Sequence, residues 1–326
     1  MRDDKSGTFA IEAQPEPSKL LESITVPETE VTGPPENPSE DTDGPKGVEY
    51  EDRVVAFVDI LGFKEIVYGS QNNRNLLNQI YGALDIRNDD LARAFSLELG
   101  LDRSADWFDD KFHSFSDSIV MSVKMDITEL GLLIFMVFHT CRQLLRAGFP
   151  SRGGIAMGPL LHRFPSVDSK NEEDRKASPM VFGPAFIDAY NLENTHADGA
   201  RVIMQTKVWK MLDGYCSENE GTRLAKFFRT HVERAEDGPA FVNLFADFPG
   251  NAFYNTEVDI SSEIQAIQKH LCKALDDTAD KPHQFRKNLM LAHEFNFALE
   301  TATAVPKYQH LERFLIPRES LPKRRS

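Results

Sequence analysis

The chain has 326 residues, of which 41% are hydrophobic, and it carries a formal net charge of −14 at neutral pH. This length leaves room for one large or two modest domains with a proper core. The negative charge disfavours a protein that wraps a nucleic-acid polymer, because such proteins need basic stripes, but it does not disfavour a nucleotide chelated to metal.

Residues 1–48 are rich in Pro, Glu, Ser, Thr and Asp, and Phe9 is their only aromatic residue. A segment of this composition buries too little apolar surface to offset the entropy that it loses on ordering. We therefore expect a disordered, acidic, Pro-rich tail, with the globular part beginning near Glu49.

The first element of the globular part is a buried strand that ends in an acid and a tight turn. Residues 54–58 are apolar and mostly β-branched, Asp59 and Gly62 follow, and residues 64–68 begin a helical pattern. Asp59 then lies where the N–H groups of the turn and the helix start converge. A carboxylate there repels a phosphate unless a divalent cation lies between them, although an acid after a strand also serves as a helix cap.

A second acid is predicted to meet the first. Two strand-like runs over residues 111–115 and 118–123 flank Ser116-Asp117, which predicts a hairpin with Asp117 at its tip. If this hairpin pairs with the first strand, Asp117 faces Asp59. Two carboxylates held close are costly unless a cation or a proton neutralises them, so the arrangement predicts a pair of oxygen-ligated Mg²⁺ or Mn²⁺ ions.

The rest of the chain alternates helical and strand patterns. We expect helices over 75–94, 126–146 and 206–212, strands over 151–161, 201–204 and 241–245, a loop over 163–178, and a turn that becomes a helix over 181–193. The central hairpin makes the sheet partly antiparallel, which predicts an α+β fold with helices on the faces of a mixed sheet.

Residues 251–326 predict a C-terminal helical extension. Three helical patterns run over 261–275, 282–302 and 306–315. Their amphipathic character indicates packing on the preceding core or on another subunit.

Cysteine usage and apolar runs bear on the compartment. Cys141, Cys216 and Cys272 lie far apart without metal-binding spacing, which is typical of a reducing cytoplasm. The longest apolar run, residues 130–138, is too short to span a bilayer, and the N-terminus has no charged-then-apolar signal. We expect a soluble, cytoplasmic protein with no membrane partner.

Four short motifs, in this order, resemble the class III nucleotidyl cyclases. They are Phe57-Val-Asp59-Ile-Leu-Gly-Phe63, Ser116-Asp117, Arg152-Gly-Gly-Ile-Ala-Met-Gly158-Pro, and Phe182-Gly-Pro-Ala with Ala189 and Leu192-Glu193. The resemblance covers residues 53 to about 250. It implies a catalytic domain over 49–250 with a βααββαβ core, and active sites between two head-to-tail subunits of a homodimer.

The resemblance also implies the catalytic and metal-binding residues. Asp59 and Asp117 would be the catalytic pair. Together with the backbone carbonyl of Ile60 they would hold two divalent cations, Mn²⁺ or Mg²⁺, as cofactors.

The nucleotide-binding residues follow from the same resemblance. N–H groups of Leu61, Gly62 and Phe63 would cradle the phosphates. Arg152 would contact the nucleotide or its phosphates, or it would instead pack at the sheet edge or pair with an acid.

The chain also departs from the family. The family's transition-state Asn and Arg fall on Ile187 and Asn191, and neither can stabilise charge developing at phosphorus as an Arg does. The adenine-reading Lys and Asp fall on Pro150 and Met180. The chain therefore keeps the metal site and lacks the purine reader.

Three further segments resemble the bacterial pyrimidine cyclases of Pycsar antiphage defence. They are Gly183 with Ala189-Tyr190 and Leu192-Glu193, Asp237-Gly-Pro-Ala-Phe-Val-Asn243-Leu-Phe, and Lys307-Tyr-Gln-His-Leu-Glu-Arg-Phe314. That likeness implies a uridylate cyclase that makes cyclic UMP from UTP, and an effector that senses the cyclic product rather than binding the enzyme. A cytidylate cyclase, a cyclase that reads ATP or GTP in another way, and a catalytically silent nucleotide-binding regulatory module remain alternatives.

Overall fold

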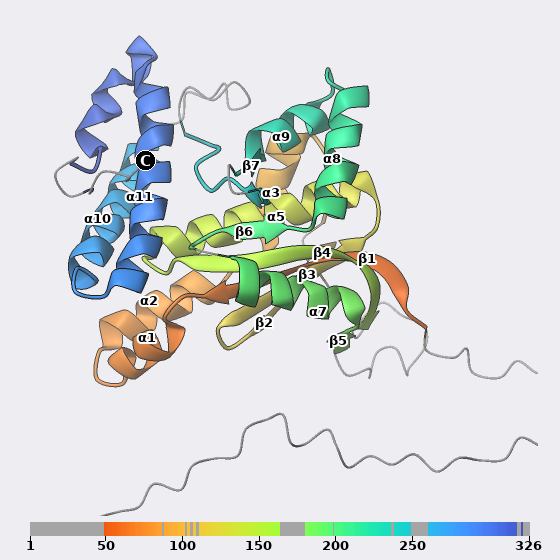
Figure 1. Cartoon of the computed structure of the whole chain (residues 1–326), viewed down its shortest axis with the longest axis horizontal. Coiled ribbons are helices and arrows are strands. Elements are labelled where there is room, and N and C mark those ends of the chain that lie inside the picture. Colours follow the sequence, from red (N-terminus) through yellow and green to blue (C-terminus); the bar gives the residue numbers. More distant parts are fainter. Residues whose placement is uncertain are drawn as a thin grey trace, which may run out of the picture. The chain divides into compact units, whose positions relative to one another are not determined.

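The computed structural model describes residues 49–86, 88–101, 103–104, 107–108, 111–163, 180–197, 199–235, 238–248, 260–317 and 321 (Figure 1). Residues 48–326 belong to one compact unit. The predicted tail over 1–48 and the predicted loop over 163–178, apart from Arg163 at the end of a strand, lie outside the described residues.

A mixed sheet forms the centre of this unit. Its strands are β1 (Glu51–Ile60), β2 (Phe112–Phe115), β3 (Ser118–Lys124), β4 (Ser151–Arg163), β5 (Met180–Phe182), β6 (Val202–Met204), β7 (Val232–Arg234) and β8 (Ala240–Val242). They run in the order β2-β3-β1-β4-β6-β8-β7, and β5 pairs with β4. Only the β4–β6 pair is parallel among the described strands. The predicted α+β fold with a mixed sheet is thus confirmed.

Helices connect and cover the strands. They are α1 (Phe63–Ser70), α2 (Arg74–Leu84), α3 (Asn88–Leu99), α5 (Ile127–Arg146), α7 (Pro184–Asn191), the π-helix η2 (Leu192–His196), α8 (Thr206–Glu218), α9 (Arg223–His231), α10 (Ser261–Asp277), α11 (Pro282–Thr303) and the 3₁₀ helix η3 (Pro306–Phe314). From β1 to β4 the described elements are a strand, the helices α1, α2 and α3, a hairpin, the helix α5 and a strand. This order and the antiparallel pairing form two interleaved split β-α-β units.

Some predicted elements were wrong. The single helix over 75–94 is two helices, because Asp85 leaves the helical region at ψ 71° and ends α2, as short acidic side chains often do. The predicted helix over 306–315 is a 3₁₀ helix over Pro306–Phe314 rather than an α-helix. The sequence patterns did not indicate β5, α9 or β7.

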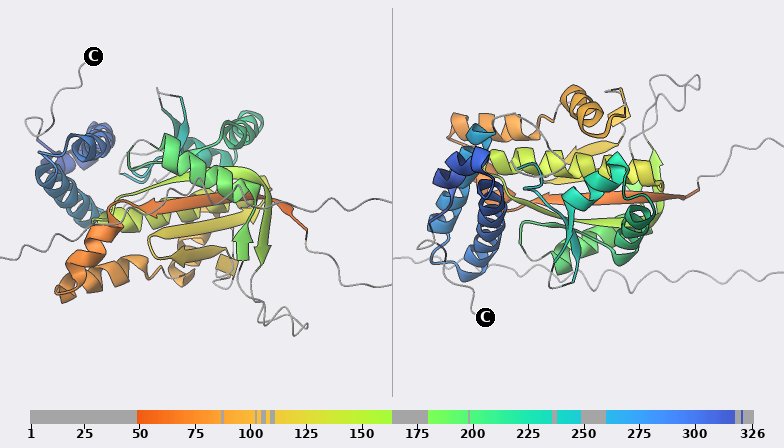
Figure 2. Two further views of the ribbon diagram at one scale, coloured as in Figure 1. Left: turned by 60° about the horizontal axis from the view of Figure 1, so that its bottom comes forward. Right: turned by 90° about the horizontal axis from the view of Figure 1, so that it is seen from above.

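Alternation along β1 creates two apolar layers. Val54, Ala56, Val58 and Ile60 pack in the larger core with α5, whereas Val55 and Phe57 belong to a smaller cluster with α7. Successive side chains of a strand point to opposite faces, so α5 and α7 cover opposite faces of the sheet, as Figure 2 also shows. Asp59 continues the Val55–Phe57 series and therefore faces the α7 side.

Helix α5 is the central helix of the larger core. Asp126 caps its start, because its carboxylate accepts hydrogen bonds from the N–H groups of Thr128 (2.8 Å) and Glu129 (3.2 Å). Among the described helices, α5 alone is long and apolar enough to span a membrane, and 72% of its apolar 18-residue window is buried inside the protein. Its buried residues, among them Leu132, Phe135 and Phe138, belong to the larger core.

The C-terminal helices share the same core. Phe295 of α11 is fully buried and lies 5.7 Å from the ring of Phe245 and 5.6 Å from that of Phe248, between ring centroids. Of the two packing modes left open by the sequence, the structure has the extension on the α+β core. In both views it lies at the end of the sheet where β1 ends (Figures 1 and 2).

Candidate active site

The end of β1 meets the tip of the β2–β3 hairpin. β3 pairs antiparallel with β1, and Asp59 is opposite Ser118, the residue after Asp117. The N–H of Ile60 donates a hydrogen bond to the carbonyl of Asp117 at 3.0 Å. Ser116 has a left-handed φ of 60°, and positive φ at the first position of a two-residue loop makes the tight turn that matches the twist of the strands. The structure thus brings the two predicted acids to one place.

The two acids also interact electrostatically. Burial raises the pKa of Asp59, the nearby charge of Asp117 raises it further, and Arg152 opposes both effects. Asp117 is half-buried. A carboxylate whose pKa is raised by burial and by a like charge is a group that a cation would stabilise.

Arg152 lies beside the acids on the neighbouring strand. It is the register partner of Asp59 on β4, and its Nε is 3.9 Å from Oδ2 of Asp59. The same Nε makes a closer ion pair with Oε1 of Glu193. Of the two alternatives for Arg152, pairing with an acid therefore holds in this structure, and it leaves the guanidinium within the site.

Glu193 belongs to this cluster, although the sequence analysis did not include it among the site residues. Its side chain is only 4% exposed. Burial raises its pKa, while the charges of Arg152 and then Lys287 oppose this and Asp59 adds to it. The only signal in the sequence was its place in the Leu192-Glu193 motif, which gives no indication of its partner.

The turn after Asp59 begins helix α1. Gly62 has a left-handed φ of 72° at the N-cap, and no side chain caps this helix. Leu61 donates its N–H to the carbonyl of Pro150 at 2.9 Å, so of the three predicted phosphate-binding amides this one is already used. The amide-bearing start of α1, with Gly62 and Phe63, follows directly after Asp59, and helix N-termini favour anions.

The residues at the site fit a hard divalent cation. Two carboxylates and the backbone carbonyl at the end of β1 are all oxygen donors, which Mg²⁺ and Mn²⁺ prefer. The mutual repulsion of Asp59 and Asp117 gives a physical reason for a cation. The described residues contain no group of three or more His, Cys, Asp or Glu side chains arranged for a metal, so the donor set here is two acids with backbone.

The positions that align with the family's base and transition-state groups are scattered. Pro150 directly precedes β4, whereas Met180 pairs with Arg163 at the other end of that strand. Within one chain they do not line one pocket. Ile187 and Asn191 are both exposed on α7.

Phe57 and Phe63, the two phenylalanines of the first motif, pack in different apolar clusters. Phe57 is buried against the rings of Phe186 (5.8 Å) and Tyr190 (5.4 Å), while Phe63 packs on the larger core at the opposite face. Their contacts are those of core residues.

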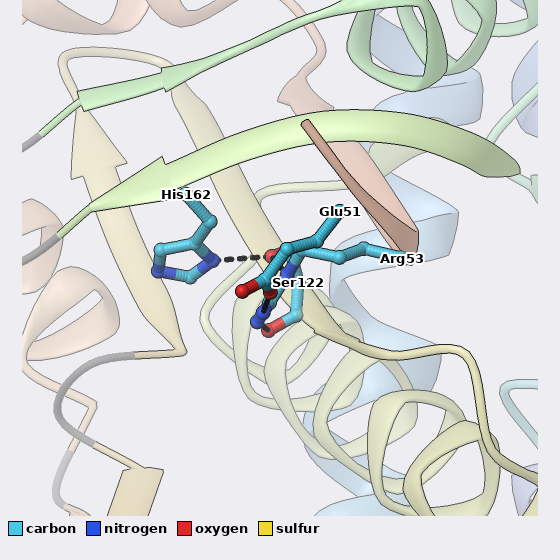
Figure 3. A network of polar contacts seen from close by, with 4 residues as sticks. All are labelled: Glu51, Arg53, Ser122 and His162. Atoms are coloured by element: carbon cyan, nitrogen blue, oxygen red, sulfur yellow. Dashed lines mark hydrogen bonds and ion pairs between the residues drawn. The ribbon is translucent and has the colours of Figure 1, made fainter. Parts of the chain in front are cut away.

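A second polar network lies near the start of β1, at the opposite end of the strand from Asp59. Figure 3 shows Arg53, which donates to Ser122 Oγ at 3.1 Å and pairs with Glu51 at 3.1 Å, while Ser122 also contacts His162. Arg53 is buried, and these partners satisfy its charge. The network links β1, β3 and β4 on the face that carries Asp59.

The chain was also compared with known proteins. No protein-family model matches it, and no curated protein matches it in sequence. The functional assignment therefore depends on the site and on the motifs themselves.

Proposed function

We propose that the chain is a class III-type pyrimidine nucleotide cyclase that converts UTP to 3′,5′-cyclic UMP and pyrophosphate. The observation that carries the proposal is the meeting of Asp59, at the end of a buried strand, with Asp117, at the tip of the paired hairpin. The order of the described elements from β1 to β4 adds support, since a strand is followed by helices, a two-stranded hairpin, a helix and a strand, which is compatible with a βααββαβ core.

The reaction requires one bond to form and one to break at the α-phosphorus. The ribose O3′ attacks this phosphorus, the O3′–P bond forms, the bond to the bridging oxygen of pyrophosphate breaks, and the hydroxyl proton passes to solvent. When bound, two Mn²⁺ or Mg²⁺ ions would lower the pKa of the 3′-hydroxyl and offset the charge on the leaving pyrophosphate. Asp59, Asp117 and the carbonyl of Ile60 would hold these ions.

Other residues of the chain would bind and orient the triphosphate. The uncapped start of α1 presents N–H groups of Gly62 and Phe63 beside Asp59, which suits phosphate oxygens. Arg152 supplies a fixed cation next to the same acid, and a guanidinium can bind two phosphate oxygens at once.

A second subunit would complete the site with a cationic group from another position, because Ile187 and Asn191 offer none in either copy where the family has its transition-state groups. The exposed surface supports a homodimer. Several large apolar side chains are exposed on β2, β5 and α7 or just before β1: Tyr50, Phe115, Met180, Phe182, Ile187 and Tyr190. Tyr50 and Phe182 are in edge-to-face contact, with ring centroids 6.2 Å apart, and exposed apolar side chains that cluster in this way favour an interaction surface.

The proposal of a pyrimidine substrate depends on the missing purine-reading side chains. Pro150 and Met180 offer no side-chain hydrogen bonds to a purine, and a buried polar group left unpaired by the wrong base costs about 1–3 kcal/mol. We therefore propose UTP first, CTP second and purines poor. The cyclic product would act in the cytoplasm as a second messenger of Pycsar-type antiphage defence, on a separate effector.

The proposal is tested with the wild-type chain and two single variants. UTP and Mn²⁺ are incubated with wild type, Asp59→Asn and Asp117→Asn, and cyclic UMP and pyrophosphate are quantified. We expect equal amounts of both products from wild type and a loss of more than about a hundredfold in each variant, with melting temperatures that show folded protein. Full activity in either variant would contradict the metal assignment, and no product from the wild-type chain would favour the silent regulatory module.

A further inference from the structure

Glu193 lies next to a close approach between the covering helix and the sheet. It is in the π-helix η2, which continues α7, and π-helical turns occur frequently at functional sites. Gly154 on β4 permits the approach, since a Cβ at this position would overlap the carbonyl oxygen of Ala189 and the side chain of Leu192. The buried carboxylate of Glu193 thereby reaches Arg152 near the start of β4, the register partner of Asp59.

One guanidinium lies between two acids of different burial. Arg152 is in closer contact with Glu193, which is 4% exposed, than with Asp59, which is 24% exposed and 3.9 Å away. A charge buried with its partner is costly to separate. Glu193, the more buried acid, therefore holds Arg152, and Asp59 is left with only the longer ion pair.

The C-terminal helix α11 supports the segment that carries Glu193. Arg201, just after η2, donates from Nε to Glu294 at 2.5 Å, and Met290 lies against Gly199. Lys287, Met290 and Glu294 are at i, i+3 and i+7, on one face of α11. The influence of Lys287 on the pKa of Glu193 agrees with this face being turned toward η2.

We propose that Glu193 is a positioning residue that holds Arg152 back from Asp59, so that the Asp59 carboxylate stays available to a divalent cation. This inference rests on the proposed cation site. Without the negative charge of Glu193, Asp59 is the acidic partner that the described residues leave to the guanidinium. A full Arg152–Asp59 ion pair would then compete with metal binding.

The test measures Mn²⁺ binding to the nucleotide-free protein by electron paramagnetic resonance. We expect Glu193→Gln to weaken Mn²⁺ binding about tenfold, within the usual range for coupling between neighbouring sites. The double variant Glu193→Gln/Arg152→Met removes the competing cation, so its affinity should return at least to that of wild type. Glu220→Gln, an exposed acid, is the matched control and should bind Mn²⁺ as wild type does.

The outcomes separate this inference from the proposed function. If wild type and Glu193→Gln bind Mn²⁺ with the same affinity, only the positioning role is overturned. The same holds if the double variant binds Mn²⁺ as weakly as Glu193→Gln does. If Glu193→Gln does not fold, Arg152→Met alone decides, since weaker Mn²⁺ binding than wild type contradicts a competing arginine. A wild-type chain that takes up no Mn²⁺ would overturn the cation site and both proposals.

Discussion

Asp59 and Arg152 are register partners on neighbouring antiparallel strands, and Nε of Arg152 lies 3.9 Å from Oδ2 of Asp59. Residues directly opposite each other on paired strands share a face, so the pair lies on the side covered by α7. Glu193 contacts the same guanidinium from η2. The proposed cation site therefore has a protein cation at its edge, held by an acid from another element.

Asp59 should destabilise the metal-free protein at neutral pH. Its pKa is raised in the folded chain by burial and by Asp117, so the folded state binds its proton more tightly than the unfolded state does. Metal-free Asp59→Asn should therefore be more stable than wild type at pH 7. The difference in the free energy of unfolding between the two proteins should shrink as the pH falls through the raised pKa of folded Asp59 toward the ordinary value of 3.8, because Asp59 then becomes protonated.

Thermal unfolding as a function of pH, with and without Mn²⁺, measures this effect. Added Mn²⁺ should raise the melting temperature of wild type, because a ligand of the folded state stabilises it, and should leave that of Asp59→Asn unchanged. A variant less stable than wild type at pH 7 would show that Asp59 makes a favourable structural contact.

The close approach of η2 to the sheet requires Gly154. In Gly154→Ala the new methyl group would meet the backbone of Ala189, so we expect a loss of about 2–4 kcal/mol in the free energy of unfolding. Gly214→Ala is the matched control, because it lies within α8 with open space around it and should stabilise by about 0.5–1 kcal/mol. Urea unfolding of both variants measures these values, and equal stabilities would contradict the tight packing.

The C-terminal extension should unfold together with the α+β core. Phe295→Ala removes a fully buried ring packed on Phe245 and Phe248, at a cost of about 3–5 kcal/mol. Phe297 on the same helix is 70% exposed, so Phe297→Ala should stay within about 0.5 kcal/mol of wild type. Calorimetry should record one transition for each protein, and a separate early transition in Phe295→Ala would mean that the extension folds independently.

The proposed homodimer should depend on the exposed apolar face of α7. Ile187 is 57% exposed there, and a lysine in its place would have to be buried in the interface. We expect Ile187→Lys to weaken dimerisation by at least about tenfold. Leu77→Lys, at a 53% exposed position of α2, should have no effect. Analytical ultracentrifugation gives both constants, and an active wild-type monomer would refute the shared site.

Local patterns predicted the elements that bring Asp59 and Asp117 together. The apolar, β-branched run that became β1 and the paired strands around Ser116-Asp117 are readable because each element is set by its own residues. The break after α2 was missed because helical periodicity continues across Asp85 and Ile86. The unpredicted β5 and β7 have three residues each, too few to display an alternating pattern.

Glu193 could not be identified from the sequence as a partner of Arg152. The two residues meet only because Gly154 lets η2 approach β4 and because α11 packs behind the following segment. Neither contact leaves a periodic trace in the sequence. Motif spacing placed Glu193 at the end of a helix, and only the packing of that helix reveals its ion pair.

A competition among four substrates decides between the proposed uridylate cyclase and its alternatives. The wild-type chain is incubated with Mn²⁺ and equimolar UTP, CTP, ATP and GTP, with Asp59→Asn as the control, and the cyclic products are resolved by chromatography. We expect cyclic UMP to be the main product of the wild-type reaction, and we expect Asp59→Asn to form none of the four cyclic nucleotides. Cyclic AMP or cyclic GMP as the main product would contradict the pyrimidine assignment, and no cyclic product at all would contradict the cyclase itself.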